Sequence, residues 1–192
     1  MAEGPAASVQ EPAGRPGLRG EGGRDLVIGI GNSLRGDDGV GWWLADRAER
    51  LRPAPRVLAV QQLTPELCGV LAEAGRVLFI DACLVAPAVA GRRRASPAGS
   101  PLEGTGPALM PLGPASGSGE AGALSHRLEP PQLLAITALL HGRVPPAMQL
   151  LVPAFDLAHR EGLSAPQRRL LPRAEALLRR WWAGRQARVP HA

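Results

Sequence analysis

Two acidic sites in the sequence could carry out chemistry. The pair Asp37-Asp38 lies near the end of a glycine-rich segment that begins at Gly29, and Asp81 ends the apolar run 77–80. In open α/β sheets, ligands bind outside the carboxyl ends of the strands. Both acidic sites fall there if the apolar runs before them are strands. We therefore expect Asp38 and Asp81 to lie close together in one cleft.

A metal ion would allow the carboxylates of Asp38 and Asp81 to stay charged while they lie close together. Carboxylates at close range repel each other, and a divalent cation between them is the usual solution. His126, just ahead of a predicted helix, can enter the same cleft as a third ligand. The O, O, N donor set of Asp38, Asp81 and His126 suits a borderline metal such as nickel or zinc, with positions open for substrate or water.

Each of these residues also has a simpler interpretation. Asp37 or Asp38 could cap the helix that follows, Asp81 could end its strand in a turn, and His126 could be an ordinary loop histidine. The sequence therefore proposes a three-residue site without establishing that the three side chains meet.

Other chemistries have less support. The chain has no Gly-x-Ser-x-Gly segment and no cysteine protease signature, which argues against a protein nucleophile. Gly29-Ile30-Gly31 begins like a dinucleotide fingerprint, but Leu34 occupies the position of the third glycine. All 22 basic residues are arginine, so the lysine of a Walker loop is also missing. A nucleotide-binding α/β domain is therefore disfavoured.

Composition limits the domain number, the partners and the compartment. A chain of 192 residues that is 45% apolar can build one domain with a proper core. The net charge is +5, but the arginines are dispersed and tyrosine is absent, so we predict no nucleic-acid binding. Cys68 and Cys83 are too few for a disulfide framework, which favours a cytoplasmic location. Residues 1–24 contain no apolar run for a signal peptide or membrane span, and we expect a disordered tail and no membrane partner.

Strands and helices are predicted to alternate in the rest of the chain. Strands are expected at 26–30, 57–60, 77–81 and 148–152, with an edge strand near 108–112 inside a long flexible excursion at 86–123. Helices are expected from Val40 to the prolines after Leu51, from the Thr64-Pro65 cap to Gly75, over 130–141, and after a capping box at Ser164. This order predicts a single α/β domain over 25–183, followed by a C-terminal tail at 184–192, with a largely parallel sheet and helices on both faces.

The segment from Gly29 to Gly41, Gly-Ile-Gly-Asn-Ser-Leu-Arg-Gly-Asp-Asp-Gly-Val-Gly, resembles the N-terminal signature of the hydrogenase maturation proteases. Three further segments agree in order: 62–67, the strand ending at 79–82, and Ser125-His126 leading into 130–134. The first metal position is often glutamate in this family and is the shorter aspartate, Asp38, here. The resemblance covers about residues 26–182.

The resemblance implies a three-layer α/β/α sandwich around a mostly parallel five-stranded sheet, of the phosphorylase/hydrolase-like kind. It implies a cytoplasmic, monomeric endopeptidase that removes the C-terminal extension of a nickel-iron hydrogenase large-subunit precursor after nickel insertion. Asp38, Asp81 and His126 would be the catalytic, metal-contacting residues. Nickel would arrive with the substrate, and zinc or cadmium could occupy the site in vitro. The alternative is a non-catalytic, nickel-dependent checkpoint or chaperone that binds the same subunit.

Overall fold

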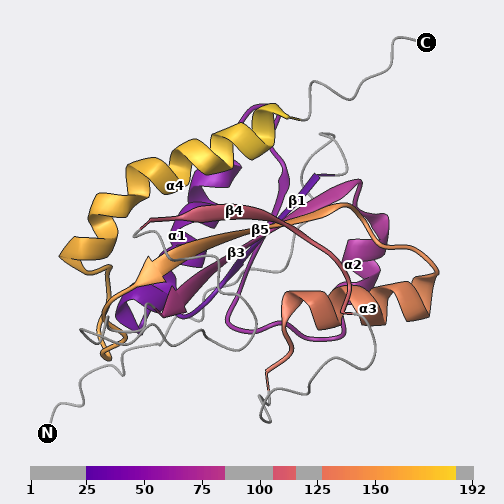
Figure 1. Cartoon of the computed structure of the whole chain (residues 1–192), viewed down its shortest axis with the longest axis horizontal. Coiled ribbons are helices and arrows are strands. Elements are labelled where there is room, and N and C mark those ends of the chain that lie inside the picture. The colour runs from indigo at the N-terminus through magenta and orange to yellow at the C-terminus, as the bar shows by residue number, and fades with distance from the viewer. Residues whose placement is uncertain (1–24, 85–105, 116–126, 185–192) are drawn as a thin grey trace, which may run out of the picture.

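A five-stranded sheet forms the centre of the protein (Figure 1). The computed structural model describes residues 25–84, 106–115 and 127–184. The strand order is β2-β1-β3-β5-β4; β2, β1, β3 and β5 are mutually parallel, and β4 runs antiparallel to β5. The predicted mostly parallel sheet is confirmed. The strands are β1 (Asp25–Ile30), β2 (Arg56–Val60), β3 (Arg76–Leu84), β4 (Ala108–Leu112) and β5 (Ala147–Ala154).

Helices cover both faces of this sheet, as the sequence predicted (Figure 1). One face packs against α1 and α4, and the other against α2 and α3. A short 3₁₀ helix, η1 (Gly36–Gly39), leads into α1. The α-helices are α1 (Val40–Glu49), α2 (Leu67–Glu73), α3 (Pro130–His141) and α4 (Ala165–Ala183). The result is a three-layer α/β/α sandwich.

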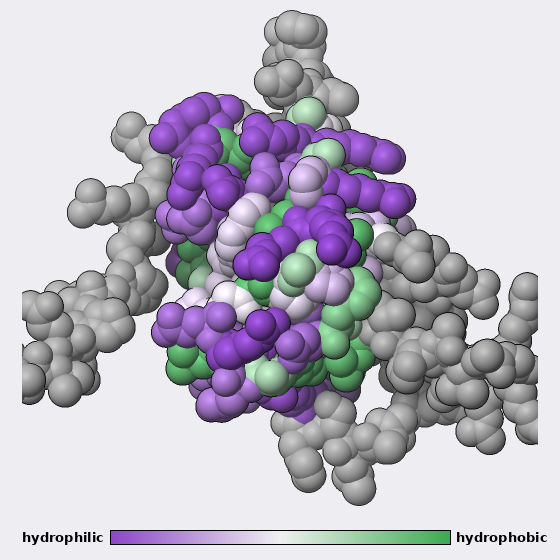
Figure 2. Space-filling model, turned by 90° about the vertical axis from the view of Figure 1, so that its left-hand side faces the viewer, coloured by the Kyte–Doolittle hydropathy of each residue, from purple (hydrophilic) through white to green (hydrophobic). Residues whose placement is uncertain are grey.

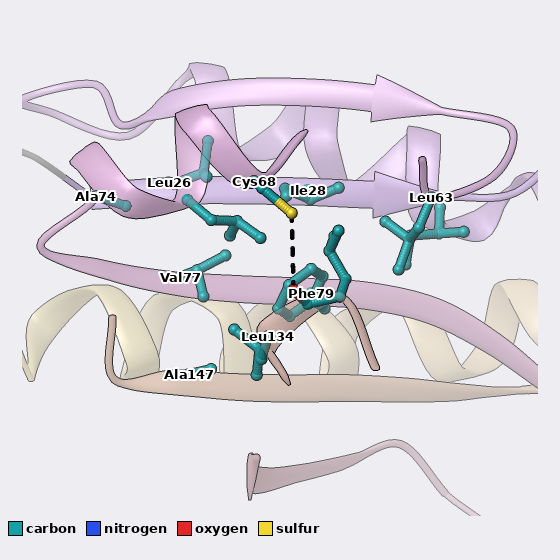
Figure 3. Packing of buried hydrophobic residues seen from close by; sticks show 12 residues of the cluster. Leu26, Ile28, Leu63, Cys68, Ala74, Val77, Phe79, Leu134 and Ala147 are labelled. Atoms are coloured by element: carbon teal, nitrogen blue, oxygen red, sulfur yellow. Dashed lines mark hydrogen bonds between the residues drawn. The ribbon is translucent and has the colours of Figure 1, made fainter. Parts of the chain in front are cut away.

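Two apolar cores explain why the strands read as continuous apolar runs. On the α2/α3 side, Leu26 and Ile28 of β1 pack with Phe79 of β3 (Figure 3). On the α1/α4 side, Val27 and Leu78, which point to the opposite face, pack with other buried residues. Successive side chains of a strand point to opposite faces, so a strand buried on both faces must be apolar throughout.

The predicted start of α2 is wrong. The helix begins at Leu67, and no side chain caps it. The Thr64 side chain instead bonds to the Glu66 carboxylate, which lowers the pKa of that group. The Leu67 N–H donates to the Thr64 carbonyl oxygen at 3.1 Å, so the Thr64-Pro65 dipeptide forms a turn before the helix. Competition between a local turn and a helix cap is typical of threonine.

The predicted start of α4 is half right. Ser164 is the N-cap, and its hydroxyl oxygen accepts the Gln167 N–H at 3.2 Å. The reciprocal bond of a capping box is absent, because the Gln167 side-chain amide donates to the carbonyl oxygens of Asp37 and Pro153. The predicted helix over 130–141 and edge strand over 108–112 are confirmed. Strand β3 extends further than predicted, to Leu84.

Several predictions fall on residues outside the described ranges. These are the N-terminal tail at 1–24, most of the excursion at 86–123, the C-terminal tail from 185 onward, and His126. Within the described part of the chain, no helix is long and apolar enough to cross a membrane.

Candidate active site

A cleft of about 190 Å³ lies at the carboxyl end of β1, beside Asp81 of β3, three residues before that strand ends. The loop after β1 forms one wall with Gly31 and Asp38, and Asp81 of β3 lies beside it. Two further segments, 61–63 and 127–130, complete the lining and are joined by a β-bridge between Leu63 and Leu128. The predicted pairing of strands 26–30 and 77–81 is what brings the two aspartates to one cleft.

Close packing of the glycine segment fixes the position of Asp38. Gly31 has φ of +137°, and a side chain on it would collide with the backbone carbonyl of Asp38. A Cβ on Gly41 would lie 2.7 Å from the Ile30 nitrogen, so only glycine lets α1 approach β1 this closely. The glycines therefore serve the packing of the loop and helix against the strand, which agrees with the failed nucleotide fingerprint.

The adjacent aspartates have different environments. The Asp37 side chain is fully buried and accepts hydrogen bonds from the N–H groups of Phe155, Asp156 and Ser164 and from the Ser164 hydroxyl. These four bonds tie the loop after β1 to the loop after β5. Asp38 is half-buried, lines the cleft and accepts one N–H, from Asn32, at 2.9 Å. Neither carboxylate caps the following helix. Asp37 thus has a structural role, and Asp38 is the residue available to a ligand.

Asp81 is held in an environment that favours its neutral form. Burial raises the pKa of its carboxyl to about 7, and the negative charges of Asp38 and Glu129 act in the same direction. The Ala82 N–H, which donates to Asp81 Oδ1 at 2.8 Å, and the positive charge of Arg127 partly offset this rise in pKa. A cation placed between Asp38 and Asp81 would favour the ionised form of both.

Sequence reasoning missed Arg127 and Glu129, which both line the cleft. Glu129 is also the N-cap of α3, where it forms a capping box with Gln132. The signal available in the sequence was a charged pair next to His126 at the start of a predicted helix. Together with Asp38 and Asp81, these residues give the described lining three carboxylates and one guanidinium.

His126 lies outside the described residues, so its predicted place in the triad stays a prediction. It directly precedes Arg127, which lines the cleft. Within the described ranges, no group of three His, Cys, Asp or Glu residues is arranged to hold a metal. Asp38 and Asp81 line the cleft with two carboxylates, which can act as oxygen donors to a cation.

The described lining of the cleft also limits the chemistry. It contains no serine, threonine or cysteine, so an acyl-enzyme route through such a side chain has no candidate there. Its carboxyl groups can bind a cation, accept a proton or orient water.

No family model and no curated protein matches the sequence. Solved structures do match. The hydrogenase maturating endopeptidase HybD from E. coli is 17% identical, with a TM-score of 0.55 over 81% of this chain and 89% of that one. The NiFe hydrogenase maturation protease HycI from Thermococcus kodakarensis is 23% identical, with a TM-score of 0.54 over 80% and 86% of the two chains. HybD from Thermococcus kodakarensis is 16% identical, with a TM-score of 0.51 over 82% and 98%.

The chain has the fold of the hydrogenase maturation proteases. The match includes nearly the full length of HybD from Thermococcus kodakarensis, so the whole sandwich is shared and not one supersecondary unit. The fold resemblance drawn from the glycine segment is therefore confirmed.

Proposed function

We propose that this protein is an endopeptidase that removes the C-terminal extension of a nickel-iron hydrogenase large-subunit precursor. The observation that carries the proposal is the meeting of Asp38 and Asp81 in one cleft at the carboxyl end of β1. The shared fold with maturation endopeptidases adds support. A fold alone does not determine a function, so the argument depends on the site.

Asp38 and Asp81, with His126, would contact the nickel that the precursor carries. One oxygen of Asp38 accepts the Asn32 N–H, which orients the carboxylate and leaves the other oxygen for the cation. Asp81 is partly protonated at neutral pH when no cation is present, because its pKa is about 7. A cation docked on the two carboxylates would favour the ionised form of Asp81, and these residues would thereby hold the adjacent peptide bond in the cleft.

Hydrolysis of the peptide needs water, a base and an acid. Water adds to the scissile carbonyl carbon, the C–N bond breaks, and the proton lost by water reaches the departing amine. Carboxylates at the cleft can relay this proton, and Arg127 can stabilise negative charge on the carbonyl oxygen. This arrangement suits metal-assisted hydrolysis without a covalent intermediate.

The test uses the large-subunit precursor of the same organism, prepared with and without nickel. Wild-type protein should shorten the nickel-loaded precursor, as measured by intact mass, and should act poorly on the nickel-free one. Asp38→Asn keeps the size of the side chain but removes its charge, and we expect cleavage to fall about tenfold or more. Asp46→Asn is the matched control, since Asp46 is an exposed residue of α1 that pairs with Arg50.

The outcomes distinguish a peptidase from a non-catalytic checkpoint or chaperone. Shortening by wild type and Asp46→Asn, with a large loss in Asp38→Asn, supports the peptidase. Tight binding of the nickel-loaded precursor without any loss of mass would instead support a checkpoint or chaperone. Equal cleavage of the nickel-loaded and nickel-free precursor would contradict nickel recognition, and the assignment as a peptidase would still hold.

A further inference from the structure

Strand β3 continues beyond the end of β1. The pairing of β1 with β3 ends at Gly29 and Ile80, whereas the pairing of β3 with β5 continues to Leu84 and Ala154. Residues 81–84 are therefore paired on the β5 side, and no strand in the described part of the chain lies along their other side.

The directions of the backbone groups follow from one hydrogen bond. The Val77 N–H donates to the Pro146 carbonyl oxygen at 3.0 Å, which places it on the β5 side. Backbone groups of successive residues in a strand point alternately to the two neighbouring strands. The N–H and C=O groups of Ala82 and Leu84 therefore point to the β1 side, beyond the end of β1.

The local hydrogen bonds agree with this assignment. The Ala82 N–H donates to the carboxylate of its neighbour Asp81 at 2.8 Å, as a substitute for a carbonyl of an adjoining strand. The Leu84 side chain is 71% exposed at the end of the strand. The backbone groups of Ala82 and Leu84 that point to the β1 side form what we call the β3 edge.

We propose that the C-terminal extension of the precursor binds as an added β-strand along the β3 edge, with its scissile peptide at Asp81. This inference rests on the proposed function and deepens it, because it assigns the substrate an extended conformation. The β3 edge is continuous with the cleft, since Asp81 lines the cleft and directly precedes Ala82, the first residue of the edge. An extended peptide that satisfies an open strand edge is a recurrent mode of peptide recognition.

Apolar side chains at the same end of the sheet fit such a peptide. Leu34 follows β1 and is 50% exposed, and Phe155 follows β5 and is 49% exposed. Figure 2, which faces this end of the molecule, shows apolar surface between polar side chains. Main-chain bonds along the β3 edge would hold peptides of varied sequence, and these side chains would contact apolar residues of the extension.

Amide hydrogen exchange tests the binding mode without using cleavage as its readout. The exchange rate of the Leu84 amide is measured in the free protein and with the nickel-loaded precursor. We expect fast exchange in the free protein and at least tenfold slower exchange in the complex. The Ala59 amide, in the edge strand β2, is the internal control. The Val60 carbonyl accepts the Gly31 N–H and so points to β1, which means that the Ala59 N–H points away from the sheet. This amide lies at the far edge of the sheet from the precursor, and its exchange should not change.

A pair of variants isolates the Leu84 N–H. Leu84→Pro removes the N–H, and Leu84→Ala removes the side chain and keeps the N–H. Proline is tolerated at a strand position whose N–H points away from a partner. The KM of Leu84→Pro for the precursor should be about threefold to tenfold above that of Leu84→Ala, as expected for one hydrogen bond. Their kcat values should agree within about twofold, and thermal melting checks that both fold.

Each result has a defined meaning. Slower Leu84 exchange together with cleavage supports both the β3 edge and the peptidase. Slower exchange without cleavage supports the β3 edge and overturns the peptidase. Cleavage with unchanged Leu84 exchange overturns the β3 edge alone. Slow Leu84 exchange already in the free protein would mean that another segment of this chain occupies the edge, which also overturns the proposal.

Discussion

Replacing Asp37 with alanine should destabilise the protein far more than the same change at Asp38. The buried Asp37 carboxylate accepts the Phe155 N–H at 2.8 Å and the Asp156 N–H at 3.0 Å. It also accepts the Ser164 N–H at 2.6 Å and the Ser164 hydroxyl at 2.8 Å. Alanine leaves all four donors without this acceptor; the two donors of Ser164 are buried, and those of Phe155 and Asp156 are part-buried.

The size of the effect follows from these four donors. Each donor that loses its partner costs about 1 kcal/mol, more for the two buried donors of Ser164 than for the two part-buried ones, so Asp37→Ala should lower the free energy of unfolding by about 4 kcal/mol. For a domain of this size, about 1 kcal/mol corresponds to roughly 2–4 °C in Tm. We therefore expect Tm to fall by about 8–16 °C. Asp38→Ala removes one accepted hydrogen bond beside a cleft, and its Tm should fall by less than about 4 °C.

Differential scanning calorimetry of both variants in a chelating buffer measures the contrast. Asp38→Ala is the matched control, since it changes the same residue type in the same loop. Activity should show the opposite order at a temperature where both proteins are folded, with Asp38→Ala more impaired than Asp37→Ala. Similar losses of Tm in the two variants would refute the assignment of Asp37 to structure and Asp38 to the site.

The remaining predictions concern the pKa of Asp81, the metal and the glycine contact. Because the pKa of Asp81 is raised to about 7, its neutral form stabilises the fold fully below about pH 4 and this contribution is lost as pH rises through 7. Measured without metal, the Tm of Asp81→Asn minus the Tm of wild type should therefore increase between about pH 4.5 and 7.5. A Tm difference that does not change with pH would contradict the raised pKa of Asp81. Purified protein should bind one divalent ion weakly in a calorimetric titration, with lower affinity in Asp81→Ala and in His126→Ala; unchanged affinity in both would remove the proposed site. Gly41→Ala should cost about 1–3 kcal/mol in denaturant unfolding because its Cβ would overlap the backbone of β1. The control Gly69→Ala, in a helix with open space around it, should be neutral or stabilising.

The sequence alone determined most of the layers. Apolar runs of four or five residues separated by helical patterns are typical of the strands of a parallel sheet covered by helices on both faces, and the structure has that sheet. The glycine segment from Gly29 to Gly41 also predicted the fold through its resemblance to a known family, and in the structure Gly29 and Gly41 allow a close backbone contact between a strand and a helix. Helix starts were less predictable: Thr64 could bond to either a helix N–H or the Glu66 carboxylate, and local pattern does not decide between them.

Tertiary structure supplied the physical reason for the different roles of the neighbouring aspartates. The sequence pattern and the family resemblance pointed to Asp38 as the site residue, but they did not show what Asp37 does. The loop after β5 distinguishes the two aspartates, because its donors lie more than 100 residues away in the chain and surround only Asp37. In the same way, the raised pKa of Asp81 depends on burial and on charges brought in by the segment before α3. Such long-range contacts leave no periodic pattern in the sequence, so they become visible only when the strands and loops are assembled.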